Sequence, residues 1–365
     1  MSQAVGQPIW SLDTPVLLVD LDRLEANIRR MARTIVHEAG VRWRPHTKAM
    51  KSPVLARMLL AAGATGITCA KLAEAEVMAA AGLDDILIAN QVVGAVKLQR
   101  LARLSAKAQV IVAIDCDAHV EAMAAAADQH GATYRLVIEL DVGMHRAGLE
   151  PGPKVIDLAR RVAACPRLKF AGLMTWESHA LKLPDADARQ RCVAEALGRV
   201  NEMAGQLRAA GLPVPIVSCG GTGTYWISPF EPGVTEIQAG GGIFCDVHYR
   251  DGLGVKHECA MTVLSTVTSR PTSTRIICDA GRKTMSADAA VPEPIGLGRI
   301  ASAGFSAEHG TIELVEPGHR PQVGDKIEFI VGYSDTTVVL HDELTATRNG
   351  VVQAVWPLVG RGRLT

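Results

Sequence analysis

The chain has 365 residues, of which 38 are basic and 38 acidic, so its formal net charge is zero. Hydrophobic residues make up 48% of the chain and charged residues 21%, which is typical of a globular protein and excludes low-complexity disorder. The lack of a basic excess argues against a nucleic-acid binder. The sequence shows neither a secretory signal nor a run of about 18 apolar residues, so no export and no membrane span are expected.

Eight cysteines are scattered along the chain without any C-x-x-C pair. In a chain of this size, such spacing is typical of reduced thiols rather than of a disulfide framework or a zinc site. It therefore predicts a cytoplasmic protein. The positions are Cys69, Cys116, Cys165, Cys192, Cys219, Cys245, Cys259 and Cys278.

A short apolar run followed by a longer segment rich in Ala, Leu and Arg recurs between residues 14 and 245. Near-continuous apolar runs are typical of strands that are buried on both faces of a parallel sheet. About eight repeats of strand and helix predict a (β/α)₈ barrel, and a doubly wound open sheet is the alternative because counting strands does not prove closure. The runs are 16–20, 41–44, 65–70, 85–90, 109–115, 135–141, 168–175, 215–221 and 235–241.

The segment 23–40 illustrates why the longer segments are expected to be helices. Its apolar residues recur at helical spacing and share one face, and Gly40 provides a stop signal. The residues on that face are Leu24, Ile28, Met31 and Ile35.

After about residue 255 the pattern changes to short strand-like runs. They are separated by turn signals such as PGHRPQVGD and RNG, which predicts a compact antiparallel β domain. The expected division is a barrel over 14–250 and a smaller β domain made of 251–365, to which 1–13 is added.

A pair of lysines follows the run 41–44. In a barrel the active site lies at the C-terminal ends of the strands, and the stretch P-H-T-K-A-M-K places His46, Lys48 and Lys51 at such an end. A partly desolvated lysine has a lowered pKa, which frees the amine to form a Schiff base. The alternative is that both lysines are solvated at the start of a helix.

A glycine-rich stretch, S-C-G-G-T-G-T over 218–224, directly follows another predicted strand. Consecutive backbone N–H groups in such a turn can bind a phosphate, and glycine allows its close approach. The stretch has no following G-K-[ST] and does not fit G-x-G-x-x-G, so it is neither a Walker A nor a dinucleotide motif. A plain tight turn is the alternative.

A third signal, D-V-G-M-H-R-A-G over 141–148, follows the run 135–141. It places Arg146 at the same mouth of the barrel, where it can face an anion or a ring oxygen; a surface arginine is the alternative. Together, the strand-end lysine, the glycine-rich loop and this arginine suit pyridoxal 5′-phosphate (PLP).

The chain resembles the fold-type III PLP enzymes of the D-threonine aldolase and D-serine dehydratase family over nearly its whole length. The resemblance implies a barrel like the N-terminal domain of alanine racemase, followed by a smaller antiparallel β domain like that of D-serine dehydratase. It also implies PLP as cofactor and a head-to-tail homodimer with a shared active site. The matching stretches are TPVLLVDLDRLEANI, RPHTKAMK, KLAEA, IANQVVG, LDVGMHRAG, CGGTGT, TEIQAGG, CDAGRK and DTTVVLHDELTATRNGVVQAVWP.

The resemblance also implies roles for single residues. Lys48 would carry PLP, because it occupies the lysine of R-P-H-x-K, and His46 would line the pocket beside it. Arg146 would lie near the phenolic oxygen of the cofactor or the substrate carboxylate, and Trp176 would pack against the ring. The phosphate would be held by Gly220, Gly221, Thr222 and Gly223, next to the strand-end residues Gln238, Ala239 and Gly240.

Two parts of the chain depart from the family pattern, and the first is the loop after the run 168–175. The family commonly has A-Y-H-G followed by a further histidine, whereas this chain has T-W-E-S. His179 and Lys182 are therefore the two candidates for the base that takes the β-hydroxyl proton. A polar surface loop is the alternative for each of them.

The second departure concerns a metal. The family usually carries H-x-C or H-x-D in its tail, which binds a divalent ion that lowers the pKa of the β-hydroxyl group. Here Tyr333 stands in place of the histidine and Asp335 at the second ligand, with His341 and Asp342 close in sequence. Asp335 is thus a candidate oxygen ligand for Mg²⁺ or Mn²⁺, and a plain loop acid is the alternative.

These features predict a PLP-dependent lyase that acts on D-configured β-hydroxy amino acids. Aldol cleavage to glycine and an aldehyde is favoured over a D-serine or D-3-hydroxyaspartate dehydratase, which would release ammonia, and over an amino-acid racemase. A PLP-binding regulator without turnover is a further alternative, although such binders resemble the barrel alone. The expected partners are an amino acid substrate and a second copy of the chain, with neither nucleic acid nor membrane.

Overall fold

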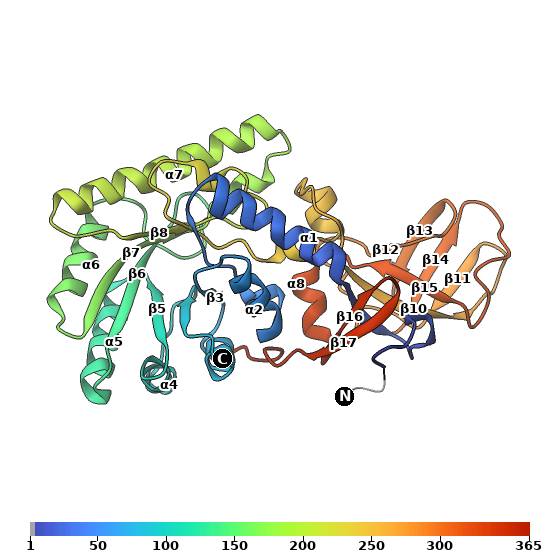
Figure 1. The fold of residues 1–365 in the computed structure, drawn as a ribbon. Helices are drawn as coiled ribbons and strands as arrows, with labels where there is room; N and C mark the ends of the chain where they lie inside the picture. Colours follow the sequence, from blue (N-terminus) through green and yellow to red (C-terminus); the bar gives the residue numbers. More distant parts are fainter. Residues whose placement is uncertain (1–3) are drawn as a thin grey trace. The chain divides into compact units, whose positions relative to one another are not determined.

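The computed structural model describes residues 4–365, which divide into two compact units (Figure 1). The barrel unit consists of residues 30–48, 53–240 and 363–365. The sheet unit consists of residues 4–29, 49–52 and 241–362. Residues 14–29, 49–52 and 241–250, expected within the barrel, thus fall in the sheet unit, and residues 363–365, expected in the β domain, fall in the barrel unit.

Eight parallel strands form the centre of the barrel unit, in the order β2-β9-β8-β7-β6-β5-β4-β3. The two end strands also meet, because an isolated parallel bridge joins His46 to Thr68 and the Thr65 N–H donates to the Trp43 carbonyl at 2.8 Å. The sheet therefore closes as a barrel, and the open-sheet alternative does not apply. The strands are β2 (Arg42–Trp43), β3 (Ile67–Cys69), β4 (Asp85–Ile88), β5 (Gln109–Ile114), β6 (Tyr134–Leu140), β7 (Leu168–Thr175), β8 (Ile216–Cys219) and β9 (Glu236–Ile237).

Helices cover the outside of this barrel, as α4 to α7 do around β5 to β8 (Figure 1). The strands β5 to β8 are therefore covered on their outer faces. In β5 the five residues after Gln109 are all buried, which explains the near-continuous apolar runs. The helices are α2 (Pro53–Ala61), α3 (Leu72–Ala80), α4 (Ala95–Ser105), α5 (Asp117–His130), α6 (Pro153–Ala164) and α7 (Ala186–Ala209).

The helix expected over 23–40 is confirmed. It consists of α1 (Leu21–Ala32) and a π-helical turn over Arg33–Glu38. All four residues of the predicted apolar face are buried. Gly40 adopts a φ of +68°, a left-handed conformation that favours glycine and ends the helix.

The sheet unit contains nine strands, and the expected antiparallel β domain is confirmed with one parallel pair, β1 with β16. Its one α-helix among the residues after 240 is the short α8 (Ser334–Thr337). The strands are β1 (Val16–Asp20), β10 (Met261–Ser269), β11 (Arg275–Cys278), β12 (Glu293–Pro294), β13 (Ile300–Phe305), β14 (Gly310–Leu314), β15 (Lys326–Ile330), β16 (Glu343–Arg348) and β17 (Val351–Pro357).

The placement of the run 16–20 in the barrel is wrong. As β1 it pairs antiparallel with β10 and parallel with β16, so it is a central strand of the sheet unit. The three middle residues of β1 are all buried, so its apolar pattern resembles that of a barrel strand. The first strand of the barrel is therefore β2.

The opening residues were expected to join the β domain, and those that the structure describes do so. Gly6 donates its N–H to the Val352 carbonyl at 2.9 Å, and Pro8 forms an isolated bridge with Val351. Residues 1–3, which belong to the same expectation, lie outside the described residues.

Within residues 4–365, no helix combines the length and the hydrophobicity that a membrane span requires. None of the eight cysteines forms a disulfide bond.

Candidate active site

The turn after β2 carries Lys48. This residue lies in the 3-10 turn Thr47–Ala49 with an exposed side chain, and its N–H donates to His46 Nδ1 at 3.3 Å. The buried Thr47 hydroxyl donates to Glu74 Oε1 at 2.8 Å, and Glu74 is itself fully buried at the start of α3. This bond fixes the backbone of the turn on which the lysine stands. Glu74 lies in the matching stretch KLAEA, yet the sequence assigns it no role.

The end of β9 lies beside this turn. The His46 N–H donates to the Gln238 carbonyl at 2.9 Å, and Trp43 Nε1 donates to the Ala239 carbonyl at 2.7 Å. A Cβ atom at Gly240 would lie 2.3 Å from the His46 carbonyl oxygen, so only glycine fits there. The structure thus brings the predicted residues 238–240 next to the predicted lysine turn.

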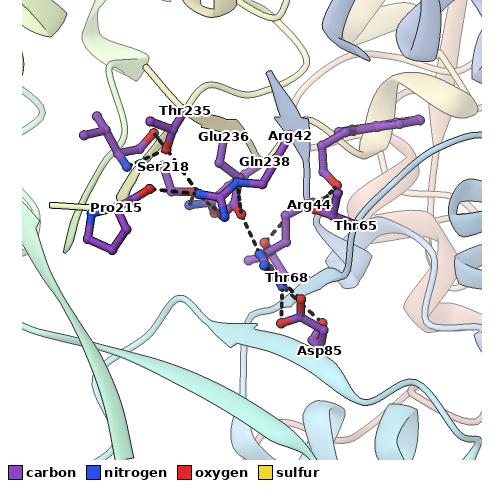
Figure 2. Close-up of polar contacts among 12 residues, drawn as sticks. Arg42, Arg44, Thr65, Thr68, Asp85, Pro215, Ser218, Thr235, Glu236 and Gln238 are labelled. Carbon is purple, nitrogen blue, oxygen red and sulfur yellow. Dashed lines mark hydrogen bonds and ion pairs between the residues drawn. The ribbon is translucent and has the colours of Figure 1, made fainter. Parts of the chain in front are cut away.

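A network of buried charges connects the strands below these residues (Figure 2). Arg44 donates from Nε to Glu236 Oε2 at 2.9 Å and from a terminal nitrogen to Asp85 Oδ1 at 2.8 Å. The other oxygen of Glu236 accepts the Ser218 hydroxyl at 2.8 Å, and Ser218 Oγ accepts Gln238 Nε2 at 3.0 Å. The network therefore reaches from Arg44, directly after β2, and from Asp85 in β4 to the predicted site residue Gln238.

The charges of this network stabilise one another. Burial alone would lower the pKa of Arg44, but the charge of Glu236 and the hydrogen bonds that Arg44 donates to Asp85 outweigh it and raise that pKa. The side chains of Arg44 and Glu236 are only 3% and 0% exposed. Because water does not reach either charge, each charge is stabilised by the other. The sequence offers no signal for this pair, because its members are 192 residues apart.

The glycine-rich loop after β8 takes the conformation that its sequence predicts. Gly220 has a φ of +76°, which a residue with a side chain rarely adopts. A Cβ atom at Gly221 would lie 2.2 Å from Cη2 of Trp176, so the indole ring lies directly against the loop. Thr222 and Gly223 are buried. The loop and Trp176, both predicted to bind the cofactor, therefore lie in direct contact.

Glu177 holds this loop by hydrogen bonds, a role that the sequence analysis missed. Its fully buried carboxylate accepts the Gly220 N–H at 3.3 Å, the Thr224 hydroxyl at 2.8 Å and the Ser228 hydroxyl at 2.5 Å. Charge-assisted bonds of this kind are stronger than bonds between neutral groups. The available signal is the unexpected acid in T-W-E-S, where the family has histidine.

Arg146 is exposed, and its Nη2 atom lies 3.6 Å from Oε1 of Glu139, a residue near the end of β6. Glu139 also accepts a hydrogen bond of 2.6 Å from Gln91 Nε2. Burial raises the pKa of Glu139 by more than Gln91 and Arg146 lower it. The guanidinium group is thus held at the mouth of the barrel by a carboxylate.

The two candidate bases lie in the 3-10 turn Ser178–Lys182 after β7. His179 is half-buried, and its ring atoms lie 3.0 to 3.2 Å from where a Cβ atom at Gly143 would be. The ring therefore packs on the loop 141–148 that carries Arg146. Lys182 is exposed.

In the sheet unit, Tyr333 and Asp335 lie at the start of α8. Tyr249 donates its hydroxyl to Asp335 Oδ1 at 3.3 Å, and the Tyr333 ring packs edge-on against His248, with the ring centres 5.1 Å apart. Burial, followed by the charge of Asp335, raises the pKa of Tyr333, so this phenol stays protonated at neutral pH. A protonated phenol does not replace the imidazole ligand of the family, and this pair does not fit a transition-metal site.

His341, which is close in sequence, does not replace the missing histidine ligand, because its ring contacts a different group. Its Nε2 lies 2.7 Å from the Thr284 carbonyl oxygen. Of the two positions that correspond to the expected metal ligands, Tyr333 and Asp335, only Asp335 therefore offers a carboxylate.

Comparison with known families gives two matches along the chain. The family described as alanine racemase, N-terminal domain, matches residues 19–247, and the putative serine dehydratase domain matches residues 260–347. The chain belongs to the alanine racemase N-terminal domain family. The resemblance to the fold-type III PLP enzymes of the D-threonine aldolase and D-serine dehydratase group is thereby confirmed.

Individual relatives of this family are similar over nearly the whole chain. D-threonine aldolase of Arthrobacter sp is 34% identical over 98% of this chain and 95% of its own length. 3-Hydroxy-D-aspartate aldolase of Paracoccus denitrificans (strain Pd 1222) is 32% identical over 98% and 94%. The crystal structure of D-threonine aldolase from Filomicrobium marinum superimposes with a TM-score of 0.94 at 33% identity, covering 99% of both chains.

Proposed function

We propose that the protein is a PLP-dependent lyase that cleaves D-configured β-hydroxy amino acids to glycine and an aldehyde. The observation that carries this proposal is the similarity to D-threonine aldolase over 98% of the chain. A lysine in the turn after β2 and a glycine-rich turn after β8 of the same barrel are the groups that this chemistry needs.

The residues of the barrel unit fit PLP. Lys48 would hold the cofactor after β2, with its phosphate at the turn 220–223 after β8, where Gly220 has a φ of +76°. Trp176 would flank its ring. When bound, PLP supplies an electron sink for the bond that breaks at Cα of the substrate.

The protein's own groups orient the substrate and move its protons. Arg146 would bind the substrate carboxylate or the phenolic oxygen of the cofactor, since its guanidinium is exposed at the mouth. A ring nitrogen of His179 would take the β-hydroxyl proton as the Cα–Cβ bond breaks, and the half-burial of this ring supports it over the exposed Lys182. A proton delivered to Cα then completes glycine.

No step of this reaction is assigned to a metal, because Tyr333 and Asp335 do not form the family's ligand pair. Asp335 alone would offer an oxygen ligand to Mg²⁺ or Mn²⁺. Metal content of the purified protein, measured with and without chelator treatment, tests that ligand directly. Turnover that survives complete removal of divalent ions supports a reaction without metal.

The proposal includes a homodimer and a cytoplasmic location. The family resemblance supports the dimer, which sedimentation of the purified protein tests. Eight cysteines without a disulfide support a reducing compartment.

The deciding experiment incubates the holoprotein with D-threonine, D-serine and D-3-hydroxyaspartate, with and without Mg²⁺ or Mn²⁺. Release of glycine and an aldehyde is expected. Release of ammonia would instead support a dehydratase, which the match to the serine dehydratase domain favours as second candidate. Interconversion of D- and L-alanine would support a racemase, and bound PLP without any turnover a regulator.

A matched pair of variants tests the lysine. After borohydride reduction, the wild type and Lys51→Ala should yield a pyridoxyl-modified peptide that contains residue 48, whereas Lys48→Ala should yield none. A modified peptide from Lys48→Ala would overturn the assignment of Lys48.

A further inference from the structure

The junction of β5 and α5 holds a cluster of ligand-type side chains that the proposed reaction does not use. Asp115 and Cys116 follow the strand, and His119 lies in the first turn of the helix. His119 Nδ1 lies 3.3 Å from Cys116 Sγ and 3.2 Å from Asp115 Oδ1. One ligand atom from each residue lies within 4.8 Å of the other two.

The three donor atoms match a tetrahedral metal site in kind and in spacing. A thiolate, an imidazole and a carboxylate are the ligands of Zn²⁺, with bonds of about 2.0 to 2.3 Å, which places neighbouring ligand atoms about 3.3 to 3.7 Å apart. The two measured separations from His119 Nδ1 are close to these values. Cys116 is the N-cap residue of α5, but its side chain forms no capping bond, so helix capping does not hold its sulfur.

A hydrogen-bonded cluster without metal explains this geometry less well. Asp115 Oδ1 and Cys116 Sγ both lie against the same nitrogen, His119 Nδ1. That nitrogen carries at most one proton, so it cannot donate fully to both neighbours. In the neutral ring whose Nδ1 bears the lone pair, the Asp115 backbone N–H donates to this nitrogen at 3.4 Å, but the ring then offers no proton to the Asp115 carboxylate that faces it. A cation between the three atoms satisfies all of them at once.

The surroundings of Asp115 orient its carboxylate toward the cluster. Its second oxygen, Oδ2, accepts the Gly148 N–H at 3.1 Å and Gln91 Nε2 at 3.3 Å. Such bonds to the outer oxygen fix a metal-binding carboxylate. The side chains of Asp115 and His119 are 20% and 15% exposed, so solvent reaches the cluster.

We propose that Asp115, Cys116 and His119 bind a borderline or soft divalent cation such as Zn²⁺. This site is separate from Tyr333 and Asp335 and goes beyond the proposed lyase activity. Because Asp115 also binds the Gly148 N–H, the ion would stiffen the loop 141–148 that carries Arg146.

Cobalt binding to the PLP-loaded protein, freed of metal by a chelator, tests the proposal. Co²⁺ should bind with a near-ultraviolet sulfur-to-cobalt charge-transfer band, and Zn²⁺ should displace it. The band should disappear in Cys116→Ser, and cobalt affinity should fall at least 10-fold in His119→Gln. Cys165→Ser, which changes a half-buried thiol after α6, and Asp335→Asn should both retain the band.

Failure of the proposal would be equally visible. Absence of the band in the wild type, or its persistence in Cys116→Ser, overturns the site whatever the enzymatic activity proves to be. Alkylation provides a second measurement that needs no variant. Zn²⁺ should slow iodoacetamide modification of Cys116 at least 10-fold and leave that of Cys165 unchanged, and equal rates at Cys116 with and without Zn²⁺ would refute binding there.

Discussion

The two units bury carboxylates in opposite ways. In the barrel unit, Glu236 is fully buried but faces the guanidinium of Arg44 at 2.9 Å. In the sheet unit, Asp246 accepts the backbone N–H groups of Tyr249 at 2.8 Å and Ser334 at 2.7 Å. Burial raises the pKa of Asp246 to about 7, and these hydrogen bonds offset only part of that effect.

The two arrangements have different consequences for stability. The ion pair inside the barrel links strands and supports Gln238 through Ser218. Removal of one partner would leave the other charge buried and unpaired, which destabilises the fold. A carboxylate that is held by backbone dipoles instead responds to pH, because its protonated form is stabilised by burial.

Removal of Glu236 should produce the largest effect. Glu236→Ala leaves the buried guanidinium of Arg44 with the half-buried Asp85 as its remaining carboxylate in the network, and a broken buried pair costs about 3–5 kcal/mol in the free energy of unfolding. Urea denaturation measures the loss. The double variant Arg44→Met/Glu236→Leu removes both charges and should lose clearly less stability than Glu236→Ala. An equal loss in both variants would show that packing, not charge, dominates.

Asp246 should give a pH dependence of intermediate size. Its pKa lies near 3.8 when exposed and at about 7 in the fold, so between these values the folded chain binds more protons than the unfolded chain. The free energy of unfolding therefore falls as pH rises through this window, by at most about 1.4 kcal/mol per pH unit.

Urea denaturation between about pH 5 and pH 7 checks this slope. Asp246→Asn, which cannot ionise, should flatten it, whereas Asp342→Asn, at an exposed position of the same unit, should leave it unchanged. A slope that persists in Asp246→Asn would assign the titration to another group.

The smallest expected effect concerns Glu177, which holds the glycine loop. Glu177→Gln keeps the shape of the side chain but replaces a charge-assisted acceptor by a neutral amide, so the loop should bind PLP about 10-fold more weakly, or about 1.4 kcal/mol. Fluorescence titration of the apoprotein with PLP measures this change. Glu195→Gln, on the exposed face of α7, is the control. Unchanged PLP affinity in Glu177→Gln would remove Glu177 from the phosphate site.

The local motifs of the sequence predicted the parts of the site that follow single strands. R-P-H-T-K and C-G-G-T-G-T lie at strand ends, and parallel strands bring such ends to one edge. The Gln238 N–H donates to the Cys219 carbonyl at 2.9 Å, directly before the glycine-rich loop, and the Gln238 carbonyl accepts the His46 N–H in front of the turn of Lys48. The roles assigned to these residues toward PLP stay predictions.

Glu177 could not be predicted in this way. Its three hydrogen-bond donors lie 43, 47 and 51 residues further along the chain. A sequence pattern reports spacing within one element, and no local period indicates that a carboxylate will be buried beneath a distant loop.

The sequence by itself determined the alternation of strands and helices, the helix over 23–40 and the lysine and glycine motifs, because these depend on neighbours within a few residues. Only the tertiary structure decided that β1 pairs with β10 and β16, and that Arg44 faces Glu236. An apolar run indicates that a strand is buried, but it does not indicate which strands pair with it. A charged residue likewise does not indicate which residue of opposite charge it will face. Both depend on contacts that form only when distant segments meet.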